Sequence, residues 1–185
     1  MKLSKLCLLT MATFSLAIGV TVTSHASTMR GSDMTYLKTS EKTPYPDLNK
    51  YSDLNILVKI KQNRVYIRNG QHTIYTMYCS AGQINKKTGK SDTPTGHFKI
   101  QQERGNSFYN KSLKEGANHW TSFKDHGVYL FHSVPTDAHG NYKEDKAELL
   151  GKKPDSHGCI RLSVPDSQWF QENMPTGTPV TIVNQ

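Results

Sequence analysis

The residues Ser156 to Leu162, Ser-His-Gly-Cys-Ile-Arg-Leu, bring a thiol, an imidazole, a hydroxyl and a guanidinium together in one short stretch. A cysteine becomes a good nucleophile when a nearby base or cation favours its thiolate. Gly158 allows backbone conformations that are closed to other residues, and consecutive amides around such a turn could stabilise an oxyanion. We therefore predict that Cys159 is a nucleophile. The alternative is a buried cysteine beside a surface histidine.

A nucleophilic cysteine needs a base, and the best candidate lies on a different segment. Residues 127–132 read as an almost continuously apolar strand that ends at His132. A strand buried on both faces places its terminal polar residue at the edge of the core. Such a histidine is often only a hydrogen-bonded structural residue. Because Cys159 must take its base from elsewhere in the chain, we predict that His132 is that base.

The rest of the chain has the pattern of a β-rich domain. Alternating apolar and polar residues predict strands over residues 54–60 and 65–67, and β-branched and aromatic residues predict a third over 74–79. Asn69-Gly70 favours a tight hairpin turn between the last two. Further strands are expected at residues 98–100, after the turn Thr93-Pro94-Thr95-Gly96, and at 180–183.

Three other segments complete the prediction. Residues 101–125 read as an irregular polar segment that either walls a binding cleft or only covers the surface. A short helix is expected over 142–150, where Gly151 would end it. A second helix is expected over 163–173, with Pro165 tolerated in its first turn.

The first 26 residues have the composition of an export signal. Lys2 and Lys5 precede an apolar run over residues 6–22, and Ser24-His25-Ala26 places small residues where a signal peptidase requires them. The run is close to the lower limit of ~17–25 residues for a membrane span and contains several hydroxyl groups. We predict a signal peptide over residues 1–26 and an exported, extracytoplasmic protein at the cell wall. A retained membrane anchor is the alternative.

The export prediction leaves one domain. Removing 26 of the 185 residues leaves 159, enough for a domain with a hydrophobic core. Residues 27–52 are rich in Ser, Thr, Lys, Asp and Pro and are predicted to form a linker or N-terminal arm. Residues 53–185 are predicted to be the catalytic domain. We expect the protein to be a monomer.

The charge of the chain limits its partners. The formal net charge is +8 at pH 7. Lysines and arginines are not interleaved with aromatic residues in the way that nucleic-acid-binding surfaces require, so we predict no nucleic-acid partner. An anionic cell envelope is the expected partner, and a basic surface that serves only solubility is the alternative.

The cysteines raise a competing interpretation. Cys79 and Cys159 remain after cleavage, and two cysteines in an exported chain could form a disulfide. That bond would consume the nucleophile, so we predict a free Cys159 and an apolar, strand-buried Cys79. Zinc bound by His132, His157 and Cys159 is a second alternative. Because Gly158 makes a regular strand there unfavourable, we predict no metal and no other cofactor.

The Ser156–Leu162 motif, with His132 upstream and Thr93-Pro94-Thr95-Gly96-His97-Phe98 before it, resembles the catalytic domain of the L,D-transpeptidase family, also called the YkuD-type domain. The similarity runs from about residue 54 to 183, and the cysteine motif is far more specific than the Pro-Thr-Gly turn. The resemblance implies a mainly β fold, a β-sandwich or mixed sheet with one or two short helices near the active-site cleft. It also implies a cysteine acyltransferase that acts on peptidoglycan stem peptides.

The same resemblance implies roles for single residues. Cys159 would be the nucleophile and His132 the proton acceptor and donor, with Ser133 orienting the imidazole through its backbone carbonyl. The implied oxyanion- and substrate-binding residues are Ser156, His157, Gly158 and Arg161. From the residue type alone, Arg161 could equally be a structural salt-bridge partner.

The implied reaction is the release of D-alanine from a stem tetrapeptide and the transfer of the acyl group to an amine, which forms a 3→3 crosslink. The alternatives are an L,D-carboxypeptidase, which would use water, and a catalytically silent wall-binding protein. The chain departs from the family pattern in two respects. His132 and Cys159 are 27 positions apart, longer than usual, with the extra residues in 137–150, and Ser133 stands where glycine is common.

Overall fold

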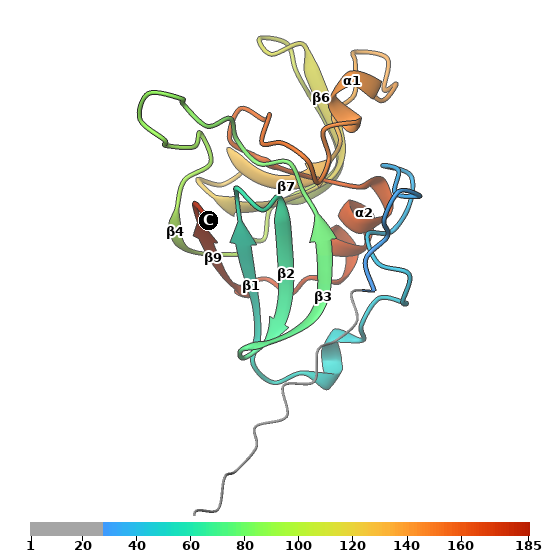
Figure 1. Cartoon of the computed structure of the whole chain (residues 1–185), viewed down its shortest axis with the longest axis vertical. Coiled ribbons are helices and arrows are strands. Elements are labelled where there is room, and N and C mark those ends of the chain that lie inside the picture. The colour runs from blue at the N-terminus through green and yellow to red at the C-terminus, as the bar shows by residue number, and fades with distance from the viewer. Residues whose placement is uncertain (1–27) are drawn as a thin grey trace, which may run out of the picture.

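Two β-sheets packed face to face form the core of the protein (Figure 1). The computed structural model describes residues 28–185. The first sheet has the strand order β3-β2-β1-β9-β4. Its strands are β1 (Leu54–Lys59), β2 (Arg64–Asn69), β3 (His72–Tyr78), β4 (Gly96–Lys99) and β9 (Pro179–Val183). Because β1 and β9 are parallel and the other pairs antiparallel, the sheet is mixed.

The predicted strands of this sheet are confirmed, and the turn differs by one residue. Asn69 pairs with His72, so the loop between β2 and β3 consists of Gly70 and Gln71. Gly70 has a φ of 58°, the left-handed conformation that favours glycine. Asn69 instead ends β2, where its side chain accepts a hydrogen bond from the Asp53 amide.

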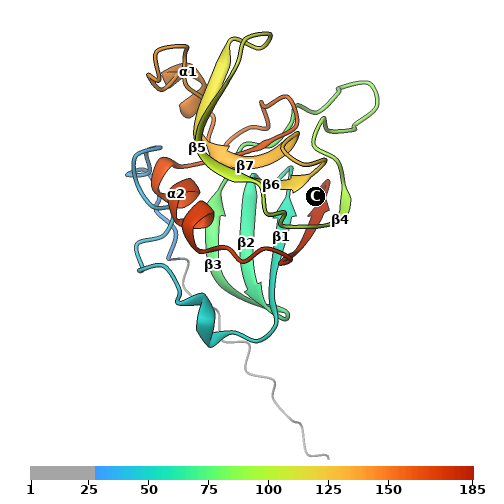
Figure 2. The same ribbon diagram turned by 180° about the vertical axis from the view of Figure 1, so that it is seen from behind.

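The second sheet has the order β5-β6-β7-β8, with β5 (Arg104–Asn110), β6 (Glu115–Lys124), β7 (Tyr129–Ser133) and β8 (Ile160–Leu162). The prediction of irregular structure over residues 101–125 was wrong, because most of this segment is the β5–β6 hairpin. It projects beyond the core (Figure 2), and much of β5 is exposed, so its sequence lacks the alternating apolar residues that mark a half-buried strand.

The space between the sheets is filled by apolar side chains from both. Ile56, Val58 and Val65 from the first sheet meet Phe131 and Leu162 from the second, and all are almost fully buried. This packing holds β7 and β8, the two strands that carry the predicted site, against a rigid support. The mainly β class with mixed sheets and short helices is therefore confirmed.

Over residues 28–185, three short helices complete the architecture: η1 (Leu48–Lys50), α1 (Glu144–Ala147) and α2 (Val164–Asn173). Helix α2 occupies the predicted range, with Ser163 as N-cap accepting a hydrogen bond from the Asp166 amide and Pro165 in the first turn. Helix α1 is shorter than the predicted 142–150. Within residues 28–185, no helix is long and apolar enough to cross a membrane.

The segment before β1 runs along the domain and is partly buried. The Ser40 hydroxyl donates to Asp166 Oδ2 at 2.5 Å, and the Tyr45 hydroxyl donates to Asp166 Oδ1 at 2.8 Å. Ser40 Oγ also accepts from the amide of Tyr78, and Glu41 Oε1 accepts from the amide of Thr76. The linker or arm predicted over residues 27–52 is described from residue 28, and through Ser40 and Glu41 it meets the free edge of β3. The predicted signal peptide and Cys7 lie outside the described residues.

Candidate active site

Parallel pairing of β7 with β8 brings the predicted base and nucleophile to one cavity. In this pairing Phe131 lies opposite Ile160 and His132 opposite Arg161, and Cys159 directly precedes β8. His132 and Cys159 both line a cavity of about 460 Å³. The cavity walls also include Phe108, Leu113, Glu115, Trp120, Val128, Leu130, Ser156, His157 and Arg161.

His132 is held in one ring orientation. It is 5% exposed, and its Nδ1 lies 2.6 Å from the Ser133 carbonyl oxygen. A carbonyl can only accept, so Nδ1 carries the proton in this contact and Nε2 is left with its lone pair. The Phe108 ring lies edge-on to the imidazole, with centroids 5.6 Å apart. The structure thus contains the backbone contact that the resemblance implied for Ser133.

The Ser133 side chain is engaged elsewhere. Its hydroxyl accepts a hydrogen bond from the Asn118 amide and donates to the Val134 carbonyl. The hydroxyl therefore supports the β6–β7 region, while the carbonyl orients His132.

The pKa shifts of both members of the pair favour their neutral forms. Burial lowers the pKa of His132 to about 4, and the positive charge of Arg161 acts in the same direction. Burial raises the pKa of the Cys159 thiol above its ordinary value. At neutral pH the site therefore holds a thiol and an imidazole, and a resting thiolate–imidazolium pair is disfavoured.

Hydrogen bonds fix the turn that carries Cys159. Ser156 Oγ accepts from the Gly158 amide at 3.0 Å and donates to the Cys159 carbonyl at 2.5 Å. Thr93 Oγ1 donates to the Gly158 carbonyl at 2.8 Å and accepts from the Gly82 amide. From the sequence, Thr93 was assigned to a turn and to the segment that carries the family resemblance, but it was given no role in the site.

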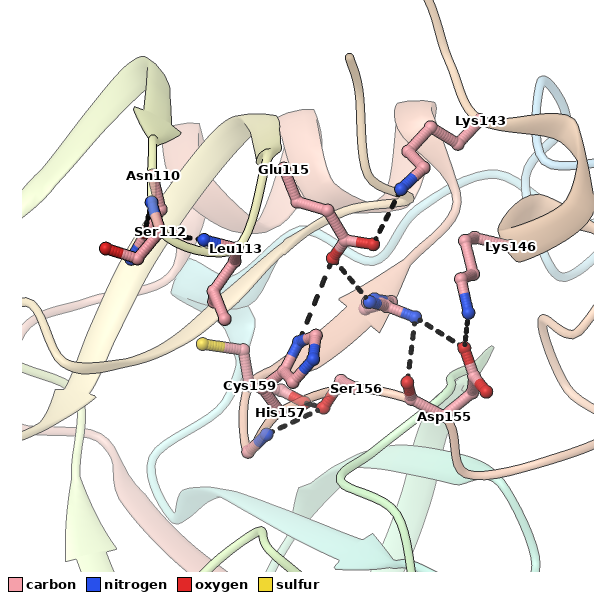
Figure 3. Close-up of polar contacts among 12 residues, drawn as sticks. Asn110, Ser112, Leu113, Glu115, Lys143, Lys146, Asp155, Ser156, His157 and Cys159 are labelled. Atoms are coloured by element: carbon pink, nitrogen blue, oxygen red, sulfur yellow. Dashed lines mark hydrogen bonds and ion pairs between the residues drawn. The ribbon is translucent and has the colours of Figure 1, made fainter. Parts of the chain in front are cut away.

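Gly158 is required by both conformation and space. Its φ is 131°, and an added Cβ would lie 3.0 Å from a ring carbon of Tyr129 and 3.1 Å from the Asp92 carbonyl oxygen. The Cys159 sulfur lies 3.6 Å from the Val128 carbonyl oxygen. In Figure 3 this sulfur points away from the neighbouring ion pairs of Glu115 and Asp155.

Arg161 occupies a buried ionic environment. Its side chain is 2% exposed, its Nη2 lies 2.9 Å from Glu115 Oε2, and its Nη1 lies 3.2 Å from Asp155 Oδ2. These contacts favour the structural salt-bridge interpretation, and a direct substrate role stays a prediction. His157 is more accessible, with Nδ1 3.9 Å from Glu115 Oε2. Sequence reasoning missed Glu115 and Asp155, which stand outside any motif recognised in the chain.

The other cysteine is remote from this chemistry. Cys79 is fully buried among apolar core residues, and burial raises its thiol pKa to about 12. Both cysteines of the described chain are free thiols, as predicted. Over residues 28–185, no group of three or more His, Cys, Asp or Glu side chains is arranged to hold a metal ion.

The arrangement is a mixed β-sandwich with a cysteine and an oriented histidine on one cavity. A sequence model of the L,D-transpeptidase catalytic domain (YkuD) matches residues 53–182. The chain belongs to this family, as the motif predicted. It is 44% identical over 138 residues to a Bacillus subtilis (strain 168) protein with the name "Putative L,D-transpeptidase YciB". The match covers 75% of this chain and 69% of the relative.

Solved structures share the fold at lower identity. An L,D-transpeptidase from Mycobacterium smegmatis matches with a TM-score of 0.54 and 18% identity, over 71% of this chain and 58% of that one. The L,D-transpeptidase LdtMt1 in complex with imipenem matches with a TM-score of 0.54 and 19% identity, over 71% and 59%. The chain thus spans somewhat more than half the length of these structures.

Proposed function

We propose that the protein is an L,D-transpeptidase that transfers an acyl group from a peptidoglycan stem tetrapeptide through a thioester on Cys159. The observation that carries the proposal is that His132, oriented through Nδ1, and Cys159 line one cavity. Membership of the family supports the reaction class. The resemblance of the motif supports the substrate class.

The first step moves one proton and forms one bond. His132 Nε2 takes the thiol proton while the sulfur attacks the carbonyl that joins the third residue to the terminal D-alanine. Gly158 already donates its amide to Ser156 Oγ, so we assign the oxyanion to the amides of His157 and Cys159. One such donor is worth about 10²–10³ in rate. His132 then protonates the departing D-alanine amine, and a thioester remains.

The second step resolves the thioester. The side-chain amine of a neighbouring stem loses a proton to His132 and attacks the thioester carbonyl. An amide forms, the thiol is regenerated, and the product is a 3→3 crosslink. Water in place of the amine would give an L,D-carboxypeptidase on the same site.

The setting of this reaction is also part of the proposal. A signal peptide over residues 1–26 would export the chain, and the positive net charge suits an anionic cell envelope. The catalytic domain would act there as a monomer.

The test uses the purified protein and disaccharide tetrapeptides, with the products weighed by mass spectrometry. A crosslinked dimer with release of D-alanine supports the transpeptidase, and a tripeptide alone supports the carboxypeptidase. Binding to peptidoglycan sacculi without release of D-alanine would identify a silent wall-binding protein and refute the proposal.

The nucleophile is tested separately with a carbapenem, whose ring opening on a thiol adds the intact drug mass. We expect Cys159→Ala to abolish this adduct and Cys79→Ala to retain it, because Cys79 is fully buried in the core. Equal labelling of the Cys159→Ala protein would contradict the assignment.

A further inference from the structure

Five charged side chains alternate in sign beside the catalytic turn. Lys143 Nζ lies 3.0 Å from Glu115 Oε1, and Glu115 Oε2 lies 2.9 Å from Arg161 Nη2. On the other side of Arg161, Nη1 lies 3.2 Å from Asp155 Oδ2, which lies 2.8 Å from Lys146 Nζ. Figure 3 shows the two lysines reaching the two carboxylates from the same side of the site.

The two outer lysines come from residues 137–150, the segment between β7 and the catalytic turn. Lys143 is the N-cap residue of α1 and Lys146 lies in its last turn, both within residues 137–150. The segment is anchored by a small cluster in which Ala147 and Leu150 pack with Val134. Tyr36 fastens it further, because its hydroxyl donates to Glu144 Oε1 at 2.6 Å. The lysines are therefore presented by an ordered element.

The three inner groups belong to the scaffold of the site. Arg161 follows Cys159 by two residues on β8, and Asp155 directly precedes Ser156. Glu115 begins β6 and lines the cavity. The amides of Asp155 and Ser156 both donate to the Ala81 carbonyl, so the Asp155 carboxylate projects from a backbone position directly next to the turn.

The lysines stabilise the ionised forms of the Glu115 and Asp155 carboxylates, which burial disfavours. The side chains of Glu115 and Asp155 are each 11% exposed, and that of Arg161 is 2% exposed. Burial by itself would raise the pKa of Glu115, but the Lys143 hydrogen bond and the charge of Arg161 hold it below its ordinary value. Lys146 and Arg161 do the same for the pKa of Asp155, which burial would also raise. One cation alone would leave two buried carboxylates to share it.

We propose that residues 137–150 form an ionic clamp, in which Lys143 and Lys146 act as positioning residues that hold Arg161 and, through it, the turn carrying Cys159. The clamp deepens the function proposed above and rests on it. Neither lysine touches the reacting atoms. Their contribution is to keep the sulfur in a fixed position in the cavity that it shares with His132, because a displacement of about 1 Å can cost about 10²-fold in rate.

The matched experiment compares two double variants with the same loss of charge. Lys143→Met/Lys146→Met removes the clamp, whereas Lys152→Met/Lys153→Met removes two exposed lysines from the adjacent loop. Two quantities are measured in each: the carbapenem acylation rate constant at saturation, and hydrogen exchange of the amides of residues 155–160.

We expect the clamp variant to acylate roughly 10- to 100-fold more slowly at saturation, with faster amide exchange over residues 155–160. The control variant Lys152→Met/Lys153→Met should match the parent in both the acylation rate and the amide exchange. The variant Lys143→Arg/Lys146→Arg should recover most of the acylation rate. A clamp variant that exchanges like the control refutes the clamp. Faster exchange with an unchanged acylation rate refutes the positioning role.

Failure of the parent to acylate and failure of the double variant to fold each have their own interpretation. A parent protein that fails to acylate refutes the proposed function, while its amide exchange still tests the clamp. If the double variant does not fold, the single variants Lys143→Met and Lys146→Met replace it. Each should raise exchange over residues 155–160 above that of Lys152→Met, and equal exchange would refute the proposal.

Discussion

The buried imidazole of His132 makes the stability of the protein depend on pH in a window set by its pKa. Burial lowers the pKa of His132 to about 4, whereas in the unfolded chain it returns to its ordinary value of about 6.5. Between these values the unfolded chain binds a proton that the folded protein does not. The free energy of unfolding therefore falls as the pH falls through this window.

The size of the effect follows from the two pKa values. A shift from about 6.5 to about 4 corresponds to a loss of about 3 kcal/mol between pH 7 and pH 4, of which about 1 kcal/mol is lost by pH 5.5. Carboxylates also titrate in acid. Glu115 and Asp155, whose pKa values are lowered, lose stabilisation at the acidic end, whereas Asp166, whose pKa burial raises, acts in the opposite direction.

The variant His132→Gln isolates the histidine, because the carboxylates are common to both proteins. Urea unfolding of the parent and the variant would be followed at pH 7, 5.5 and 4. We expect the parent to lose about 3 kcal/mol more than His132→Gln between pH 7 and pH 4. Parallel pH profiles for the two proteins would show that His132 is not buried in neutral form. Because His132 stays neutral and able to accept a proton down to about pH 4–5, the acylation rate of the parent should not fall until the pH reaches that range.

Two substitutions test the support around the pair. Ser133→Ala removes the acceptor of the Asn118 amide but keeps the carbonyl that orients His132. It should lower the free energy of unfolding by about 1–2 kcal/mol and leave carbapenem acylation within about threefold; loss of acylation in a folded variant would contradict the carbonyl-only role. Gly158→Ala forces a Cβ against Tyr129 at a φ of 131° and should slow acylation by about 10²-fold, measured on the folded protein. Parent-like acylation would show that the turn can be rebuilt.

The sequence predicted those parts of the fold in which one face of a strand or helix is buried, because apolar residues then recur at regular spacing along the chain. β1, β2 and α2 have apolar positions at regular spacing, or a recognisable cap such as Ser163, and their ranges agree closely with the prediction. The β5–β6 hairpin could not be found in this way. Its pairing is held by backbone hydrogen bonds between two strands whose side chains are largely polar.

The site shows the same division. Cys159 and His132 could be selected because their chemistry is rare and their motif specific. Glu115 and Asp155 are ordinary acidic residues, and only the folded chain brings them to Arg161 from two separate segments. They are important because they are buried, and a single acidic residue in a sequence gives no sign that it will be buried.

The contacts of Ser40 and Glu41 with β3 bear on how the protein can be shortened. β3 is the outermost strand of its sheet, and these two side chains occupy amides at Tyr78 and Thr76 that another chain could otherwise bind. A truncation at residue 53, where the family match begins, would uncover that edge together with the Asp166 carboxylate. Exposed edges recruit strands from other molecules. A recombinant fragment designed on the family boundary alone would therefore be prone to self-association. A fragment for expression should begin at residue 28 or earlier.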